Sequence, residues 1–200
     1  MNRTTTFQHK QQHSLGYVTT NDGTEVFHKD WGHGQPIVFH HGWPLSSDDW
    51  NARMMFFLER GYRVVAHDRL GHGLSSLPAE DHDIDTYAVD APVVAAHLDV
   101  HEALHIGHST GGGEAARYVA RYADGRDAKA VRIVAILPLM LKTDANPAGL
   151  PLEVFNGFRE GTGFHRAQCY RDVAAGPFYG FTRRRHAIGG HHRQLGGVSA

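Results

Sequence analysis

The chain has 200 residues, enough for one domain with a substantial core or for most of a larger domain. Hydrophobic residues make up 41% and the formal net charge is −1, so the overall charge does not indicate a nucleic acid or an anionic membrane as partner. The single cysteine excludes an internal disulfide and is typical of a reducing compartment. Without an apolar run long enough for a membrane span or a secretory signal, we expect a cytoplasmic protein.

The chain alternates between short apolar runs and longer segments with helical periodicity. We expect residues 1–14 to be flexible and residues 16–32 to form a hairpin around Asn-Asp-Gly at 21–23. Because a proline in a helix interior costs about 3 kcal/mol, we expect a kink or a late start of one helix at Pro92. Repeated strand–helix–strand units predict a mostly parallel sheet with helices on both faces. The strands are predicted at 36–40, 62–68, 103–109 and, buried, at 130–137, and the helices at 46–61, 84–100 and 110–123.

Residues 105–114 read HIGHSTGGGE and place Ser109 between a predicted strand and a predicted helix. The spacing Gly107-x-Ser109-x-Gly111 is typical of a sharp turn that exposes a nucleophilic serine. The backbone N–H of Thr110, at the helix start, would point at a developing oxyanion. The alternative is a glycine-rich turn with an incidental serine. The strand–turn–helix context favours the nucleophile.

A second loop, His40-His41-Gly42-Trp43-Pro44, follows the predicted strand 36–40. In open α/β sheets, ligands bind beyond the carboxyl ends of the strands, which is where this loop begins. Gly42 permits a close backbone approach, so the Trp43 N–H is the candidate second oxyanion donor. The alternative is an ordinary loop in which Trp43 only packs. The later segment DRLGHGLS, at 68–75, is expected to hold its loop in place rather than to take part in chemistry.

The histidines, glycines and arginines of the chain suggest three alternative sites, for a metal ion, a phosphate group and a nucleic acid. His97, His101 and His105 recur every four residues, but His105 lies in a predicted strand, so the three cannot share a helix face. With no His-Glu-x-x-His and no cysteine cluster, no metal site is predicted. The glycines after Ser109 lack the Gly-Lys-Ser/Thr of a phosphate loop. The short basic run RRRH at 183–186 is typical of a solvated surface, and we expect no nucleic-acid partner.

These motifs together resemble the α/β-hydrolase family, specifically its cofactor-free, non-heme bacterial haloperoxidase branch, which includes perhydrolases and arylesterases. The resemblance covers residues 15–182 and rests on HHGWPLSSDDW, FFLERGYRVVAHDRLGHGLSS, DIDTYAVD, LHIGHSTGGGEAARYVARY and LPLMLKTDANPAGLP. It implies a serine hydrolase or perhydrolase that acts on esters or short carboxylic acids through an acyl-enzyme on Ser109. It also implies no metal, heme or other cofactor, with hydrogen peroxide and halide as further substrates. From the charge and the absence of a membrane span, we expect no membrane partner. The site residues it implies are Ser109 as nucleophile, Trp43 and Thr110 as backbone oxyanion donors, and Gly107, Gly111, His41 and Gly42 as the structural motif.

The same resemblance divides the chain into a core at 15–137, the start of a cap region at 138–182 and an aberrant tail at 183–200. In the family, the acid and the base of the catalytic triad follow the cap. No aspartate or histidine after Ser109 matches them, so we expect neither in this chain. We therefore expect a truncated, frameshifted member with a disordered tail, whose fold lacks the last strands and helices. A catalytically inactive fragment is the alternative to a working hydrolase.

Overall fold

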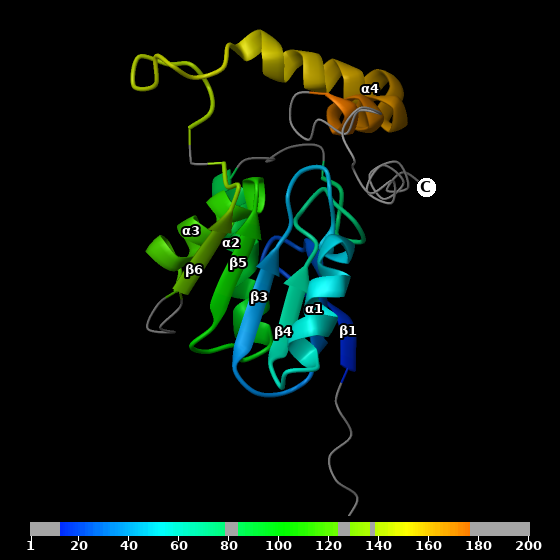
Figure 1. Cartoon of the computed structure of the whole chain (residues 1–200), viewed down its shortest axis with the longest axis vertical. Helices are drawn as coiled ribbons and strands as arrows, with labels where there is room; N and C mark the ends of the chain where they lie inside the picture. Colours follow the sequence, from blue (N-terminus) through cyan, green and yellow to red (C-terminus); the bar gives the residue numbers. More distant parts are fainter. Residues whose placement is uncertain (1–12, 79–83, 124–128, 137–138, 177–200) are drawn as a thin grey trace, which may run out of the picture. The chain divides into compact units, whose positions relative to one another are not determined.

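The computed structural model describes residues 13–78, 84–123, 129–136 and 139–176 (Figure 1). It divides into two units, Met1–Ala135 and Ile136–Ala200. The predicted aberrant tail at 183–200 lies outside the described residues, as does most of the segment predicted to be flexible. The prediction is wrong for His13 and Ser14, which belong to the first strand because they pair with Trp31 and Asp30.

A six-stranded sheet with the order β1-β2-β4-β3-β5-β6 organises the first unit. β1, β2 and β4 are antiparallel neighbours, whereas β4, β3, β5 and β6 run parallel. This confirms the predicted α/β class, with an N-terminal hairpin followed by a mostly parallel sheet. The strands are β1 (His13–Thr19), β2 (Glu25–Trp31), β3 (Pro36–His40), β4 (Arg63–His67), β5 (Leu104–His108) and β6 (Lys129–Ile133).

One face of the sheet is covered by α1 (Asn51–Leu58). The predicted helix at 46–61 is in fact two elements, because the 3₁₀ turn η1 (Ser47–Trp50) precedes α1. The side chain of Ser46 caps this turn by accepting a hydrogen bond from the Asp48 N–H at 3.3 Å. The core of this face contains Trp50, Met54 and Leu58 packed with Ile37, Phe39, Val64, Ala66 and Ile106.

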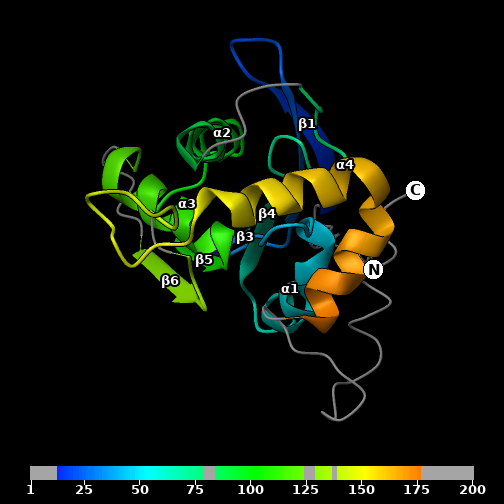
Figure 2. The same cartoon turned by 90° about the horizontal axis from the view of Figure 1, so that it is seen from above.

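The opposite face is covered by α2 (Ile84–His97) and α3 (Thr110–Arg121), as Figure 2 shows. Because side chains alternate along a strand, Val38 and Val65 point to this face while their neighbours point to the other. The core here contains Val18, Val26, Val38, Val65, Ala91, Val94, Ala95, Val100, Ala103 and Tyr118. Helices on both faces therefore agree with the sequence.

Pro92 lies inside α2, which begins at Ile84, so the late start expected at this proline is wrong, whereas the expected kink stays a prediction. Ala91, Val94 and Ala95 are buried against the sheet, each no more than 4% exposed. Tertiary packing of an apolar face supplies most of the stability of a helix in a protein, so it offsets the local cost of the proline. Among the described helices, none combines the length and hydrophobicity needed to cross a membrane.

β6 is the edge strand, and the prediction of a buried strand there is wrong. All five residues of Lys129–Ile133 are exposed, including Val131 at 41% and Ile133 at 42%. The apolar composition that predicted burial is real, but among the described strands β6 has a hydrogen-bonded neighbour on the β5 side only. Edge position rather than composition therefore sets the exposure of this strand.

The second unit contains α4 (Leu152–Ala175), which is divided into two arms at His165. His165 has φ −153° and ψ 79°, outside the helical region, so the hydrogen-bond ladder breaks there. Side chains of both arms line a cavity of about 550 Å³, including Phe158, Phe164, Cys169 and Val173.

Candidate active site

Ser109 occupies the single residue between β5 and α3. Its backbone has φ 54° and ψ −120°, a conformation that costs of order 1–3 kcal/mol for a residue with a side chain. The Ser109 N–H donates to the Ile133 carbonyl of β6 at 3.1 Å, and its own carbonyl accepts from the Gly112 N–H at 3.1 Å. The strand-to-helix turn predicted from the sequence is therefore present, and its strain is held by bonds on both sides.

Glycines at positions 107 and 111 are required by close backbone approaches. A Cβ on Gly107 would overlap the carbonyl oxygen of Gly111, where α3 begins its first turn beside β5. A Cβ on Gly111 would overlap the carbonyl oxygens of His40 and His41 at the end of β3. The glycines of the motif thus allow the start of α3 to lie against two neighbouring strands.

The loop after β3 reaches the same turn. A Cβ on Gly42 would lie 3.0 Å from Nδ1 of His108 and 3.2 Å from the Cβ of Ser109, so this glycine brings the loop against the serine. The Trp43 N–H donates to the side-chain hydroxyl of Thr110 at 3.0 Å. The structure therefore brings Gly42, Trp43, Ser109 and Thr110 together, and the roles predicted for them as nucleophile and oxyanion donors stay predictions.

Asp68, at the end of β4, fixes the loop that follows. Its carboxylate accepts hydrogen bonds from the Ser47 N–H at 2.6 Å and the Leu74 N–H at 2.8 Å. The Ser75 hydroxyl donates to the Asp68 carbonyl and accepts from the Phe27 N–H at 2.8 Å. These bonds give the segment at 68–75 the structural role predicted for it.

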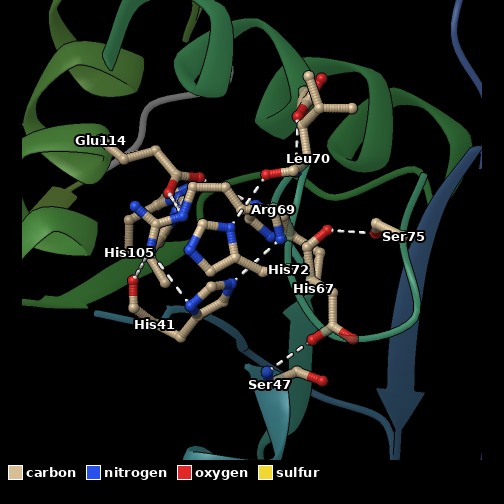
Figure 3. A network of polar contacts seen from close by, with 12 residues as sticks. His41, Ser47, His67, Arg69, Leu70, His72, Ser75, His105 and Glu114 are labelled. Atoms are coloured by element: carbon tan, nitrogen blue, oxygen red, sulfur yellow. Dashed lines mark hydrogen bonds and ion pairs between the residues drawn. The ribbon is translucent and has the colours of Figure 1, made fainter. Parts of the chain in front are cut away.

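Arg69 is the residue that sequence reasoning missed most clearly. Its guanidinium is 1% exposed and connects three parts of the site (Figure 3). Nη1 donates to the Thr110 hydroxyl at 3.0 Å, Nη2 donates to the His41 carbonyl, and Nε lies 3.6 Å from Oε2 of Glu114. One buried cation therefore joins the turn of Ser109 to the end of β3.

The carboxylate of Glu114, on α3, lies at the centre of a buried polar network. Its Oε1 accepts from Nδ1 of His40 at 2.8 Å and from Nε2 of His67 at 2.9 Å. Because Nδ1 of His40 donates, its Nε2 accepts from Nδ1 of His105 at 2.9 Å. The His105 ring stacks on Tyr118 with ring centroids 4.2 Å apart. The contacts of His40 and His105 are consistent with neutral imidazoles, whose pKa values burial lowers.

Ionisation in this network follows from burial and from the charges of its members. Burial acts to raise the pKa of Glu114, but the adjacent His40 and His67 hold it well below its usual range. Burial lowers the pKa of His105 to about 2. Burial, followed by the charge of Arg69, holds the pKa of His41 well below its usual range. Burial acts to lower the pKa of His67, but the Glu114 carboxylate raises it above its usual value. The Glu114 carboxylate and the Arg69 guanidinium are therefore opposed charges in the network, and His67 is the imidazole most favoured to carry a proton.

His40, His67 and Glu114 also have the composition of a metal site, with candidate ligand atoms within 4.8 Å of one another. The three side chains instead satisfy one another by hydrogen bonds, and Arg69 supplies the positive charge that a cation would bring. This donor set therefore fits a self-contained network better than a metal ion. The sequence signal that could have found it is a histidine at the carboxyl end of each of two neighbouring strands, β3 and β4.

The acid and base of a triad were expected to be missing, and the described residues place no histidine in hydrogen-bond contact with the Ser109 hydroxyl. His165, which follows Ser109 in sequence, lies in the second unit. His186, His191 and His192 lie outside the described residues. The general base that would activate Ser109 is therefore not identified among the described residues.

The comparisons with known proteins agree with this architecture. A family model for the alpha/beta hydrolase fold matches residues 35–194. The chain is 61% identical over 169 residues to a non-heme haloperoxidase of Rhodococcus erythropolis and 58% identical over 171 residues to a bifunctional esterase/perhydrolase of Acinetobacter calcoaceticus. Each match covers 84% of this chain and 62% of the relative, so the chain spans less than two thirds of these relatives.

A solved structure extends the comparison to three dimensions. The bromoperoxidase from Bacillus anthracis is 30% identical with a TM-score of 0.81, over 92% of this chain and 68% of that protein. The family model and the relatives match the segments that contain Ser109, Trp43 and Glu114. The chain belongs to the α/β-hydrolase family.

Proposed function

We propose that the chain contains the nucleophile of a serine ester hydrolase or perhydrolase, and that this nucleophile is Ser109. The observation that carries the proposal is the strained backbone of Ser109, which sits at the start of α3 with the Gly42–Trp43 loop against it. Strained backbone that the surrounding structure holds in place is a feature of active sites. The names of the relatives, a haloperoxidase and an esterase/perhydrolase, support the same reaction class.

In the proposed reaction, Oγ of Ser109 gives its proton to a general base as it attacks the carbonyl carbon of an ester, and a tetrahedral intermediate with a negatively charged oxygen forms. The first-turn N–H of Thr110 has no partner within its helix, and the positive end of α3 favours an anion there. Trp43, in the loop after β3, contributes to the stabilisation of this oxygen through its backbone N–H, which donates to the Thr110 hydroxyl. Collapse of the intermediate breaks the bond to the alcohol, which takes a proton as it leaves, and an acyl-serine remains.

Water that attacks the acyl-serine releases a carboxylic acid, whereas hydrogen peroxide releases a peracid. Both transfers regenerate the serine hydroxyl, and a released peracid oxidises halide in solution. Each step needs a general base, which typically contributes 10²–10⁴-fold to the rate. The alternative, binding without turnover, is favoured by one observation: the described residues present no base to the Ser109 hydroxyl.

Turnover measurements separate these two functions. We expect the hydrolysis of p-nitrophenyl acetate, and the formation of peracetic acid from acetate and peroxide, to be lost in Ser109→Ala. Thr143→Val, a change on the surface of the second unit, should leave both rates unchanged. Turnover that persists in Ser109→Ala would overturn the serine mechanism. A folded chain that turns over neither substrate would support the binding alternative.

A further inference from the structure

The side chain of Thr110 is held in an unusual way for a residue beside a nucleophile. Its hydroxyl oxygen accepts two hydrogen bonds, one from the Trp43 N–H and one from Nη1 of Arg69, both at 3.0 Å. Neither donor can also accept, because amide and guanidinium N–H groups carry protons only. Both lone pairs of the hydroxyl are therefore used by groups that point toward it.

This geometry leaves the hydroxyl proton of Thr110 as its only remaining hydrogen-bonding group. No described residue accepts that proton, and Thr110 is partly exposed. We propose that the Thr110 hydroxyl is an anion-binding donor beside Ser109, and that the Trp43 amide acts on the anion through this hydroxyl rather than by direct contact. The proposal rests on the proposed function and names the oxyanion of a carboxylate or a tetrahedral intermediate as the ligand.

The charge behind this donor comes from Arg69. Hydrogen bonds in a chain polarise one another, so a hydroxyl that accepts from a guanidinium and an amide becomes a stronger donor. The guanidinium is 1% exposed, and bulk water therefore screens its charge little. Its other contacts, with the His41 carbonyl and Glu114, orient Nη1 toward Thr110. Arg69 is thus a positioning and polarising residue, and Thr110 is the group that touches the anion.

Removal of the Thr110 hydroxyl distinguishes two roles that this group could have in anion binding. If the hydroxyl donates to the anion, its removal weakens anion binding. If the hydroxyl instead blocks the Trp43 amide, its removal frees that amide and tightens binding. The two readings therefore predict opposite signs for one isosteric change, Thr110→Val.

The probe is acetate at neutral pH, titrated into the isotope-labelled 200-residue chain and followed by amide chemical shifts. Loss of a hydrogen bond to a charged group typically weakens binding by roughly 10-fold or more. We expect that loss for Thr110→Val, and an affinity within about 3-fold of the unaltered chain for Thr110→Ser, which keeps the hydroxyl. Thr143→Val is the control for loss of a threonine hydroxyl elsewhere.

Equal or tighter binding by Thr110→Val would overturn the proposal, as would an unaltered chain that shows no saturable acetate shifts near residues 109–111. Circular dichroism establishes that each variant is folded. If Thr110→Val is unfolded, Thr110→Ala removes the same hydroxyl without added atoms and is judged by the same outcomes.

The turnover assay of Ser109→Ala distinguishes this proposal from the proposed function. Acetate binding that depends on the Thr110 hydroxyl, together with turnover that does not depend on Ser109, refutes the serine mechanism alone. Turnover that depends on Ser109, together with acetate binding that is indifferent to the hydroxyl, refutes the anion-donor role alone.

Discussion

Replacement of Glu114 by glutamine tests the buried network beneath the Ser109 turn. The carboxylate is fully buried and faces His40 at 2.8 Å, His67 at 2.9 Å and the guanidinium of Arg69 at 3.6 Å. Glutamine keeps an oxygen that accepts hydrogen bonds from both imidazoles, so those bonds remain and lose only the extra strength that a charged acceptor gives them. What disappears is the countercharge of Arg69.

The expected change in the free energy of unfolding follows from the loss of the charge that faces Arg69. Removal of one partner from a buried ion pair costs about 3–5 kcal/mol, because the other charge stays buried and uncompensated. Each hydrogen bond to a charged group is worth about 1 kcal/mol more than its neutral counterpart, but the contributions of one network are not additive. We therefore expect Glu114→Gln to lower the free energy of unfolding by about 3–5 kcal/mol, a large share of the 5–15 kcal/mol of an ordinary domain.

Urea unfolding at about pH 7, followed by circular dichroism, measures this change. The matched control is Glu59→Gln, at the exposed end of α1, which should change the free energy by about 0.5 kcal/mol or less. The carboxylate of Glu114 has a lowered pKa in the folded state, so its stabilisation is present above the unfolded pKa and is lost as pH falls through the folded pKa. A Glu114→Gln chain within about 0.5 kcal/mol of the unaltered chain at neutral pH would refute the reasoning.

Two further changes probe the turn and a second buried carboxyl. Gly107→Ala should lower the free energy of unfolding in urea by about 3 kcal/mol or more, because its Cβ would overlap the backbone of Gly111. In the control Gly157→Ala, the new Cβ meets nothing within 4 Å and should stabilise the chain slightly. Equal effects of the two changes would contradict this explanation. Burial raises the pKa of Asp90 from 3.8 to about 6, so the stability this carboxyl contributes is fully present below about pH 3.8 and is lost as pH rises through about 6. Asp90→Asn should therefore be up to about 3 kcal/mol more stable than the unaltered chain at about pH 8, and about equally stable at about pH 3.5. Urea unfolding at both pH values measures this difference. The surface change Asp144→Asn is the control and should not show it.

The sequence was sufficient to predict the main architecture because its local signals agree. Short apolar runs bounded by glycine-rich loops predicted the parallel strands, and the position of Ser109 between one such run and a helix predicted the strand-to-helix turn. Where tertiary context decides, prediction from sequence failed. α2 includes Pro92 without a late start because the helix packs on the sheet, and β6 is exposed because it lies at an edge of the described sheet.

The polar network was not predicted, for a different physical reason. His40, His67, Arg69 and Glu114 are distant in sequence and carry no shared spacing, since they come from two strands, a loop and a helix. Charged and imidazole side chains are typically exposed, and although His40 and His67 each end a strand, nothing local indicates that Arg69 and Glu114 are buried with them. Only the parallel pairing of β3 with β4 and the position of α3 bring them into contact.

The most direct test of the account is whether Ser109 reacts as a nucleophile. The chain would be incubated with a fluorophosphonate, and the modified residue located by mass spectrometry after proteolysis. We expect one phosphonyl group on Ser109, lost in Ser109→Ala and retained in Thr143→Val. A folded chain without an adduct, or one whose adduct lies on another residue and persists in Ser109→Ala, would contradict it.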